Sequence, residues 1–461
     1  MLQPLWTARE VADATGGRIE GEFTADGVTF DSREVGPGDL FVALKGVRDG
    51  HEFVEQSFGS GAAGALVSQR VSGGPYVEVG ETLTALEQLG VAARERAPQV
   101  RRGAVTGSVG KTSVTQAIRA GLDLAGPAHG SVKSFNNHIG VPLTLARMPR
   151  DVERAVFEIG MNHADEIAPL SRFVRPHAVC ITTVGPVHIE NFPDGEEGVA
   201  KAKAEIFEGL ESGGVAVLNR DNPWFEFLSD RARDHGARIL SFGSDAASDA
   251  RLIDFIPDSD GADVSAVLHG ETIRYRLSQP GFHWGPNSLA TLLMLEALDV
   301  PRDTALQALR DFRPLAGRGA ARAVPVAGGE FLLIDESYNA NPISMGAGFR
   351  SLGARRDVTG RRIVVLTDML ELGGHSERLH AGLAEPILEA GIDLVFTAGP
   401  AMRALHEALP AARRGAWAED AASLAPVVVE AMRPGDVVMV KGSNGSKASL
   451  VAKALAGMGS A

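Results

Sequence analysis

Residues 106–113 form the stretch whose residue types and spacing most directly indicate chemistry. They read Thr-Gly-Ser-Val-Gly-Lys-Thr-Ser, a glycine-rich turn that ends in a lysine and two hydroxyl side chains. The backbone N–H groups of such a turn can surround a phosphate, while Lys111 reaches the terminal phosphates and the Thr112 hydroxyl can bind Mg²⁺. A strict P-loop has glycine at the position of Val105, so this is a variant loop. The predicted phosphate-binding residues are Gly107, Ser108, Gly110, Lys111, Thr112 and Ser113.

The residues on either side of this loop predict the elements that hold it. An apolar run at 103–105 precedes the loop, and apolar side chains recur at helical spacing from Val114 to Leu122, until Gly126 ends the pattern. The predicted order is strand, loop, helix, which brings the loop amides and a helix N-terminus to one anion. The alternative is an ordinary glycine-serine turn before a surface lysine.

Two other predicted strands end in polar side chains that could join a phosphate site. Glu158 follows the apolar run 155–157, and His188 follows the run 178–183. Because ligands bind at the carboxyl ends of the strands in an open parallel sheet, Glu158 is predicted to bind Mg²⁺ through oxygen. His188 is a less expected ligand, since Mg²⁺ prefers oxygen, and an ordinary loop position is its alternative.

A predicted helix begins near Gly195, runs past Phe207 and carries Lys201 and Lys203. Lysines on a helix ordinarily form a solvated face. Two residues advance a helix by about 200°, so the two lysines are expected on different faces.

Length and periodicity predict an α/β protein with three domains. At 461 residues the chain exceeds what one hydrophobic core usually serves. We expect a small mixed α/β domain over residues 1–85, a central P-loop domain with a parallel sheet over 86–312, and a Rossmann-like domain over 313–461, where strands and helices alternate. In the first domain, the run Asp31-Ser32-Arg33 directly follows a strand and by itself is consistent with turn chemistry.

Composition narrows the class of partners. The chain has 58 acidic and 45 basic residues, for a formal net charge of −13. This balance argues against nonspecific binding to nucleic acid or to anionic membranes. Its single cysteine excludes an intrachain disulfide. No run approaches the length of apolar sequence that a membrane span needs, so a cytoplasmic enzyme or binding protein is expected.

Several runs, in this order along the chain, resemble the Mur ligase family. Besides the phosphate loop they are FNNHIGVPL at 135–143, EIGM at 158–161, GPVHIE at 185–190, AKAEIF at 202–207, GR at 317–318, DESYNANP at 335–342 and DMLELG at 368–373. The runs at 135–143, 335–342 and 368–373 are most similar to family members that add a dipeptide. The chain departs from the family pattern at Val109, Trp284 and Glu336.

The resemblance implies an enzyme that uses ATP to phosphorylate a carboxylate, which an amine then attacks to form an amide. The implied substrates are UDP-N-acetylmuramoyl-tripeptide and D-alanyl-D-alanine, joined in the last cytoplasmic step of peptidoglycan precursor assembly. The first domain would bind the UDP end of the substrate, the central domain would bind ATP, and the third would close on ATP and the dipeptide. A monomer without nucleic-acid or membrane partners is expected.

The resemblance also implies roles for residues. One Mg²⁺ and the phosphates would be held by Lys111, Thr112 and Glu158. A second Mg²⁺ would be held by His188 and a carbamylated Lys203, so these residues would be catalytic together with Lys111 and Glu158. Asn287 is implied to contact adenine, Arg318 to contact a phosphate, and Asp335 to contact the nucleotide. The implied substrate-binding residues are Ser32, Arg33, Asn136, Asn137, Tyr338 and Asn339.

Two alternatives remain at this point. One is a related ligase with the same ATP-binding unit and a different acceptor, similar to folylpolyglutamate synthase. The first domain and the dipeptide-type runs argue against it. The other is a nucleotide-binding protein that ligates nothing, which would keep the phosphate loop but would not need His188, Lys203 or the run at 335–342.

Overall fold

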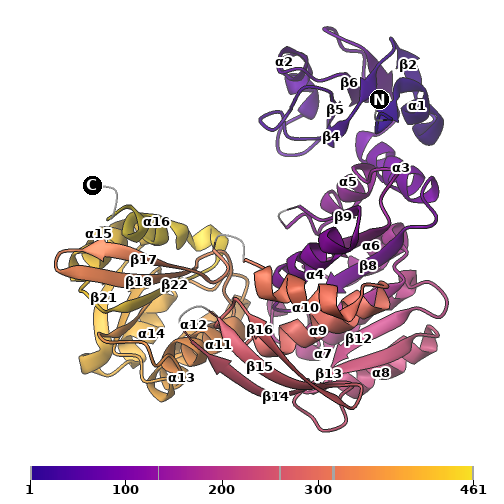
Figure 1. The fold of residues 1–461 in the computed structure, drawn as a ribbon. Helices are drawn as coiled ribbons and strands as arrows, with labels where there is room; N and C mark the ends of the chain where they lie inside the picture. The colour runs from indigo at the N-terminus through magenta and orange to yellow at the C-terminus, as the bar shows by residue number, and fades with distance from the viewer. Residues whose placement is uncertain (1–2, 133, 259–260, 314–316, 459–461) are drawn as a thin grey trace.

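Three main β-sheets follow one another along the chain. The computed structural model describes residues 3–132, 134–258, 261–313 and 317–458. The strands of the three sheets fall within residues 18–78, 101–277 and 320–441. In Figure 1 the N-terminal sheet lies at one end of the central part, and the C-terminal sheet lies beside the central part. This arrangement confirms the predicted α/β class, while the domain boundaries at 85 and 312 stay a prediction.

The N-terminal sheet has the strand order β2-β7-β6-β5-β4, in which β2 alone pairs in the antiparallel direction. Its strands are β2 (Arg18–Glu20), β4 (Gly27–Thr29), β5 (Asp39–Val42), β6 (Gly64–Val67) and β7 (Tyr76–Glu78), beside a small pair of β1 (Trp6–Thr7) and β3 (Thr24–Ala25). The helices are α1 (Ala8–Thr15), α2 (Val54–Gly59) and α3 (Thr82–Glu95). Thr7 and Glu10 form a capping box at the start of α1.

The central sheet has the order β16-β15-β14-β13-β12-β11-β8-β10-β9. The six pairings from β9 to β14 are parallel, whereas β15 joins β14 and β16 in the antiparallel direction. The strands are β8 (Arg101–Thr106), β9 (Ala128–Gly130), β10 (Arg154–Glu158), β11 (Ala178–Ile181), β12 (Val215–Asn219), β13 (Arg238–Gly243), β14 (Ala250–Pro257), β15 (Ala262–Leu268) and β16 (Glu271–Leu277). Because β8 lies between β10 and β11 and all three strands run parallel, the polar groups at their carboxyl ends lie at the same edge of the sheet.

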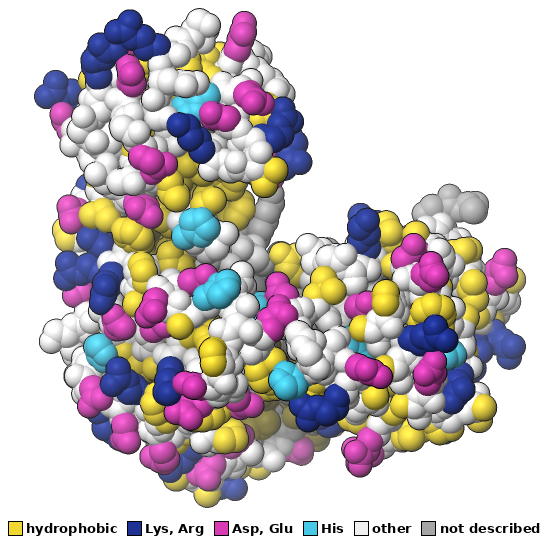
Figure 2. Space-filling model, turned by 180° about the vertical axis from the view of Figure 1, so that it is seen from behind, with side chains coloured by type: hydrophobic (Ala, Val, Ile, Leu, Met, Phe, Trp, Pro, Cys, Tyr) yellow, Lys and Arg dark blue, Asp and Glu magenta, His cyan; other side chains and the backbone are white. Residues whose placement is uncertain are grey.

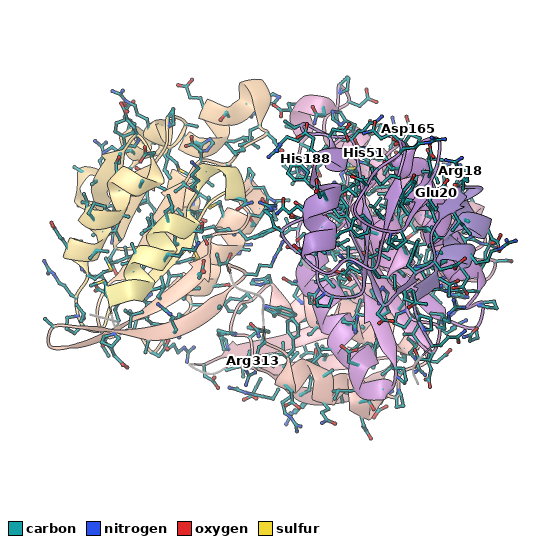
Figure 3. The ribbon with its side chains drawn as sticks, turned by 90° about the horizontal axis from the view of Figure 1, so that it is seen from above. Arg18, Glu20, His51, Asp165, His188 and Arg313 are labelled. Carbon is teal, nitrogen blue, oxygen red and sulfur yellow. The ribbon has the colours of Figure 1, made fainter. Side chains whose placement is uncertain are left out.

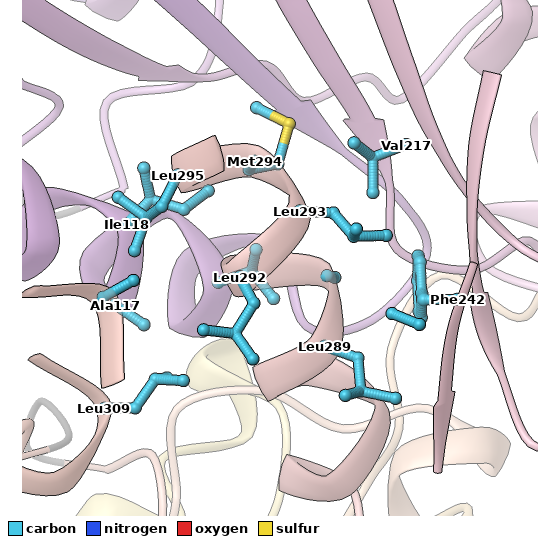
Figure 4. Packing of buried hydrophobic residues seen from close by; sticks show 14 of the residues in the cluster. Ala117, Ile118, Val217, Phe242, Leu289, Leu292, Leu293, Met294, Leu295 and Leu309 are labelled. Carbon is cyan, nitrogen blue, oxygen red and sulfur yellow. The ribbon is translucent and has the colours of Figure 1, made fainter. Parts of the chain in front are cut away.

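Helix α9 organises the core under this sheet. The helices of the central part are α4 (Lys111–Ala125), α5 (Gly140–Ala146), α6 (Ile167–Val174), α7 (Glu196–Ala204), α8 (Phe225–Asp234), α9 (Trp284–Ala297) and α10 (Arg302–Asp311). Figure 4 shows Leu293 and Leu295 of α9 packed among Ile118 of α4 and Val217 and Phe242 of the sheet. A helix that is apolar on nearly every face must be buried, and α9 therefore fixes the phosphate-loop helix against the strands.

The helix predicted from Gly195 past Phe207 is shorter than expected. Helix α7 ends at Ala204, and the chain continues as a 3-10 helix, η3 (Glu205–Gly209). The side chain of Glu205 turns back to accept backbone N–H groups of residues 165, 167 and 168 near α6. These bonds tie the helix end to a neighbouring element, which periodicity alone does not reveal. The other 3-10 helices are η1 (Gly50–Phe53), η2 (Ile189–Asn191), η4 (Gly373–His375), η5 (Ala411–Arg413) and η6 (Asn444–Ser446).

The C-terminal sheet has the order β17-β18-β22-β19-β20-β21, and β17 is its antiparallel strand. Its strands are β17 (Ala320–Val326), β18 (Gly329–Glu336), β19 (Arg362–Thr367), β20 (Leu394–Ala398), β21 (Arg414–Ala418) and β22 (Val437–Lys441). The helices are α11 (Pro342–Gly353), α12 (Ser376–Ala381), α13 (Ala384–Glu389), α14 (Met402–Ala408), α15 (Ala421–Ala431) and α16 (Ser449–Gly457). The four inner strands were predicted, whereas β17 and β21 were missed.

The surface carries charges of both signs. On the face shown in Figure 2, acidic and basic side chains are intermixed over all three parts. Within the described residues, no helix is both long enough and apolar enough to cross a membrane.

Candidate active site

A cavity of about 1250 Å³ lies where the central and C-terminal parts meet. Its wall contains most of the residues singled out in the sequence: Ser108, Gly110, Lys111, Thr112, Ser113, Asn136, Asn137, Glu158, His188, Asn287, Arg318, Tyr338 and Asn339. Five further predicted residues do not line it, namely Ser32, Arg33, Gly107, Lys203 and Asp335. The tertiary structure therefore brings together side chains from both sides of a domain junction.

The phosphate loop has the predicted strand, loop and helix, running from β8 into α4. Gly110 has φ 88° at the start of α4, a conformation that favours glycine. At Gly107 a Cβ atom would come within 2.0 Å of the Thr182 hydroxyl, so a side chain has no room there. Lys111 Nζ donates to the Gly107 carbonyl at 2.6 Å, and burial lowers the pKa of Lys111. The loop thus holds its lysine against its own backbone.

Glu158 lies at the end of β10 and is 1% exposed. Its Oε1 accepts a hydrogen bond from Asn136 Nδ2 at 2.7 Å, and its Oε2 has no hydrogen-bond partner among the described residues. A buried carboxylate oxygen without a partner is costly unless a cation satisfies it. Together with the Thr112 hydroxyl in the same wall, this oxygen fits a hard cation such as Mg²⁺.

Asn136 and Asn137 have different surroundings although both line the cavity. Asn137 Oδ1 accepts the backbone N–H groups of Ile139 and Gly140 at 3.2 and 2.9 Å, at the start of α5. Its side chain therefore caps a helix, whereas that of Asn136 holds Glu158. The run at 135–143 does not by itself distinguish the role of Asn136 from that of Asn137.

His188 lies in the loop after β11 with a left-handed φ of 51°. Its Nδ1 is 2.5 Å from Oε2 of Glu371, which belongs to the C-terminal part. Figure 3 shows His188 on the side of the central part that faces the C-terminal part. Burial lowers the pKa of His188, although Glu371 acts in the opposite direction. The ring is therefore favoured in the neutral form that binds metals.

The two lysines of α7 differ as their spacing predicts. Lys201 is exposed and pairs with Glu197 and Asp194 at 2.9 and 3.4 Å. Lys203 is 2% exposed, and burial together with the nearby charge of Lys111 holds the pKa of Lys203 well below its ordinary value. Within the described ranges, no group of three or more His, Cys, Asp or Glu side chains is arranged to hold a metal ion.

The C-terminal part supplies the opposite wall. The Arg318 guanidinium stacks over the Tyr338 ring at 4.2 Å and donates to Ser134 Oγ at 3.2 Å, which joins the two parts. Lys441, at the end of β22, donates to Glu336 Oε2 at 2.7 Å and to the Asn339 carbonyl at 3.1 Å. These contacts pre-position cationic groups beside the phosphate loop.

Glu336 takes the place in the cavity wall that was expected for Asp335. Asp335 Oδ1 instead accepts the backbone N–H of Ser337 at 3.1 Å. Sequence reasoning also missed Ser134, Glu371 and Lys441. Lys441 could have been found, because a polar residue follows the apolar run of β22 just as Glu158 follows that of β10.

Ser32 and Arg33 lie in the N-terminal part, after β4. The side chain of Arg33 is 84% exposed and forms two hydrogen bonds with the Asp31 carboxylate, at 2.8 and 2.6 Å. Ser32 and Arg33 thus lie outside the wall of the main cavity, and their role in binding substrate stays a prediction.

Two family models match the chain. The Mur ligase middle domain matches residues 105–295, and the model described as Mur ligase, glutamate ligase domain matches residues 322–444. Over 407 residues the chain is 35% identical to the UDP-N-acetylmuramoyl-tripeptide–D-alanyl-D-alanine ligase of Escherichia coli (strain K12). The aligned residues cover 87% of this chain and 88% of that protein.

Solved structures of similar fold are also Mur ligases. MurF from Acinetobacter baumannii aligns over 100% of both chains with a TM-score of 0.86 and 27% identity. MurF from Thermotoga maritima, solved in complex with ADP, shares the fold with a TM-score of 0.79 and 23% identity, over 94% of this chain and 97% of that one. With the phosphate loop, Glu158, His188 and Arg318 gathered in one cavity, this chain belongs to the Mur ligase family.

Proposed function

We propose that this protein is an ATP-dependent ligase that joins D-alanyl-D-alanine to UDP-N-acetylmuramoyl-tripeptide, with ADP and phosphate as products. The observation that carries the proposal is that the phosphate loop shares one cavity with Arg318 and Tyr338 of the C-terminal part. The similarity to ligases of that name over most of the chain supports the choice of substrates. A UDP-linked precursor and ATP are cytoplasmic compounds, so the cytoplasm is the proposed place of the reaction.

The chemistry begins with a carboxylate, which is a poor electrophile. The carboxylate oxygen attacks the γ-phosphorus of ATP, the bond to the ADP oxygen breaks, and an acyl phosphate forms. The dipeptide amine then attacks the carbonyl carbon and loses a proton, and phosphate leaves. The protein contributes mainly positioning and charge stabilisation. Lys111 and Arg318 can balance the phosphate charges, since both line the cavity.

One Mg²⁺ would be held by Thr112 and by Oε2 of Glu158, which has no hydrogen-bond partner in the described part of the chain. Bound there, the ion would neutralise phosphate charge during transfer. A second Mg²⁺ would be held by His188 and by Lys203 as a carbamate. Burial favours the neutral amine of Lys203, which is the form that reacts with carbon dioxide. The modification would convert this amine into a carbamate, whose two oxygens share one negative charge.

The substrates are assigned to different parts of the chain. Ser32 and Arg33 would bind the uridine-nucleotide end, and Arg33 offers the charged donor. Asn287 would contact the adenine of the nucleotide, and its position beside Gly110 of the phosphate loop supports this role, since a Cβ added at Gly110 would be 3.2 Å from Asn287 Oδ1. Tyr338 and Asn339 would face the acyl group and the dipeptide from the C-terminal side.

A coupled assay tests the proposal. Phosphate release should require both the muramoyl tripeptide and D-alanyl-D-alanine, and mass spectrometry should detect the new amide. Release that depends on a folate and glutamate would instead identify a folylpolyglutamate synthase-like ligase. Slow release that no acceptor stimulates would identify a nucleotide-binding protein without ligase activity.

A further inference from the structure

We propose that Phe135 is a positioning residue that couples two ligand sites, so that binding of the UDP end of the substrate and binding of Mg²⁺ with the nucleotide strengthen each other. The inference rests on the proposed function, which assigns the UDP end to the run at 31–33 and one Mg²⁺ to Thr112 and Glu158. It goes beyond that function, in which neither Phe135 nor a link between the two sites has a part.

Phe135 connects the central part to the strand end that carries the run at 31–33. Its ring packs against the ring of Phe30, with 6.2 Å between the centroids and 56° between the planes. Phe30 follows β4 and directly precedes that run. Arg147, which ends α5, secures the same strand, because its Nε donates to the Val28 carbonyl at 2.5 Å and its guanidinium lies 5.8 Å from the Phe135 ring. The position of Phe135 thus depends on where the end of β4 lies.

Helix α5 belongs to both parts. All seven of its residues are buried, and two of them, Leu143 and Ala146, belong to the hydrophobic core of the N-terminal part. Phe135 and Ile139, which precede the helix, pack against the same core. Figure 1 shows α5 between the N-terminal sheet and the central sheet. Because close-packed interiors deform little, a shift of the N-terminal part is carried to the residues before α5.

The residue after Phe135 orients the proposed Mg²⁺ ligand. Asn136 Nδ2 donates to Glu158 Oε1 at 2.7 Å, and the Asn136 carbonyl accepts the Gly160 N–H at 2.8 Å. A Cβ added at Gly160 would lie 2.9 Å from Asn136 Cγ. One added at Gly140 would lie 2.6 Å from the backbone carbonyl carbon of Phe135. With neighbours this close on both flanks, the segment cannot shift without moving the Glu158 carboxylate.

The residue before Phe135 contacts the nucleotide side. Ser134 Oγ lies 3.5 Å from the Thr112 hydroxyl and accepts a hydrogen bond from Arg318 at 3.2 Å. Three consecutive side chains, those of residues 134–136, therefore contact the phosphate loop, the N-terminal part and the Mg²⁺ ligand. Because they share one backbone segment, a change in the position of one of them changes the positions of the others.

The sign of the coupling follows from the run at 31–33. The Arg33 side chain is 84% exposed, so the UDP end must order this run when it binds there. Ordering the residues next to Phe30 favours the position in which Phe135 and its neighbour hold Glu158. By linkage, Mg²⁺ with the nucleotide then favours binding of the UDP end by the same factor.

Isothermal titration calorimetry on the full-length protein tests the coupling. Mg²⁺ with the non-hydrolysable analogue AMP-PCP is titrated without and with saturating UDP-N-acetylmuramoyl-tripeptide, and the UDP-linked tripeptide is titrated without and with Mg²⁺ and AMP-PCP. The ratio of the two Kd values should be about tenfold in the wild type and equal in both directions. In Phe135→Leu and in Phe30→Leu the ratio should fall to within about twofold of one, because a ligand that no longer shifts the segment changes no affinity. The double variant should lose no more than either single variant, since both changes remove the same contact.

Phe58→Leu is the matched control. Phe58 is also half-buried in the N-terminal part, but it packs against the cluster that contains Phe41, on the face of the sheet opposite to Leu40 and Val42. This variant should keep the wild-type ratio. A variant that is merely less stable lowers the fraction of chain that can bind, which calorimetry reports as a lower stoichiometry. Instability by itself therefore leaves the ratio unchanged.

The outcomes separate a failure of this inference from a failure of the proposed function. A ratio of one in the wild type, or the wild-type ratio in Phe135→Leu, would overturn the coupling and leave the ligase proposal intact, since both ligands still bind. The same loss in Phe58→Leu as in Phe135→Leu would also overturn it, because the contact with Phe30 would then not be its cause. A wild type that binds Mg²⁺ with AMP-PCP but no UDP-linked tripeptide would overturn the proposed function, and the inference with it.

Discussion

The side-chain amide of Asn136 donates to Oε1 of Glu158 at 2.7 Å, which leaves Oε2 as the oxygen without a partner among the described residues. Two elements meet in this contact, because Asn136 precedes α5 and Glu158 ends β10. The amide thereby determines which carboxylate oxygen is available to a cation.

Asn136→Ala should therefore raise the Mg²⁺ concentration needed for half-maximal ligation by about 10- to 100-fold, as expected when a partner of a metal ligand is removed. The value of kcat at saturating Mg²⁺ should change much less. Asn137→Ala is the matched control, since its side chain caps α5. It should lower stability by about 1 kcal/mol and leave the Mg²⁺ dependence unchanged. Equal Mg²⁺ dependence in both variants would contradict the assignment.

Lys203→Ala should be nearly inactive and should recover part of its activity when acetate is added, because a small carboxylate can replace the oxygens of the proposed carbamate. Lys201→Ala should stay active, since Lys201 is exposed and pairs with surface carboxylates. Labelling with ¹³C-bicarbonate should give a carbamate signal in the wild type and in Lys201→Ala only. Full activity of Lys203→Ala in bicarbonate-free buffer would rule the carbamate out.

Arg33→Ala should raise the KM for the UDP-linked substrate by about 10- to 100-fold, the range of a hydrogen bond to a charged group. The KM for ATP should stay within about twofold, because Arg33 lies outside the cavity that holds the phosphate loop. Steady-state kinetics with each substrate varied in turn measure both constants. An unchanged KM for the UDP-linked substrate would return the run at 31–33 to ordinary turn chemistry.

His129 predicts a dependence of stability on pH. Burial lowers the pKa of His129 from 6.5 to about 4, and its Nε2 lies 2.7 Å from the Thr144 carbonyl. As the pH falls, the ring of His129 binds a proton near pH 6.5 in the unfolded chain but only near pH 4 in the folded chain. The resulting loss in the free energy of unfolding is thus absent above pH 6.5, grows as the pH falls and levels off below pH 4 at about 3 kcal/mol.

Thermal unfolding measured from pH 7 to 4 checks this expectation. The Tm should fall over this range, and the fall should be smaller in His129→Gln, which keeps a polar side chain that does not titrate. A pH profile identical to that of the wild type would show that other groups govern the acid instability.

Local features of the sequence determined the phosphate loop, the strand that ends in Glu158, the strand that precedes the loop of His188, and the inner strands of the C-terminal sheet. Glycine placement, helical periodicity and short apolar runs are properties of neighbouring residues, so they can be read without the fold. The strands β17 and β21 were missed because both lie at edges of the sheet. Edge strands need not be apolar, and β17 even contains Pro325.

Tertiary structure alone decided which side chains meet. Alternation along β18 sends Asp335 and Glu336 to opposite faces, but only packing decides that Glu336 reaches the cavity. The helix period separates Lys201 from Lys203, yet burial of Lys203 depends on what covers that face. Likewise, Glu371 meets His188 because two domains dock at that point. Contacts between segments far apart in the chain depend on how whole elements pack, and no local pattern encodes that packing.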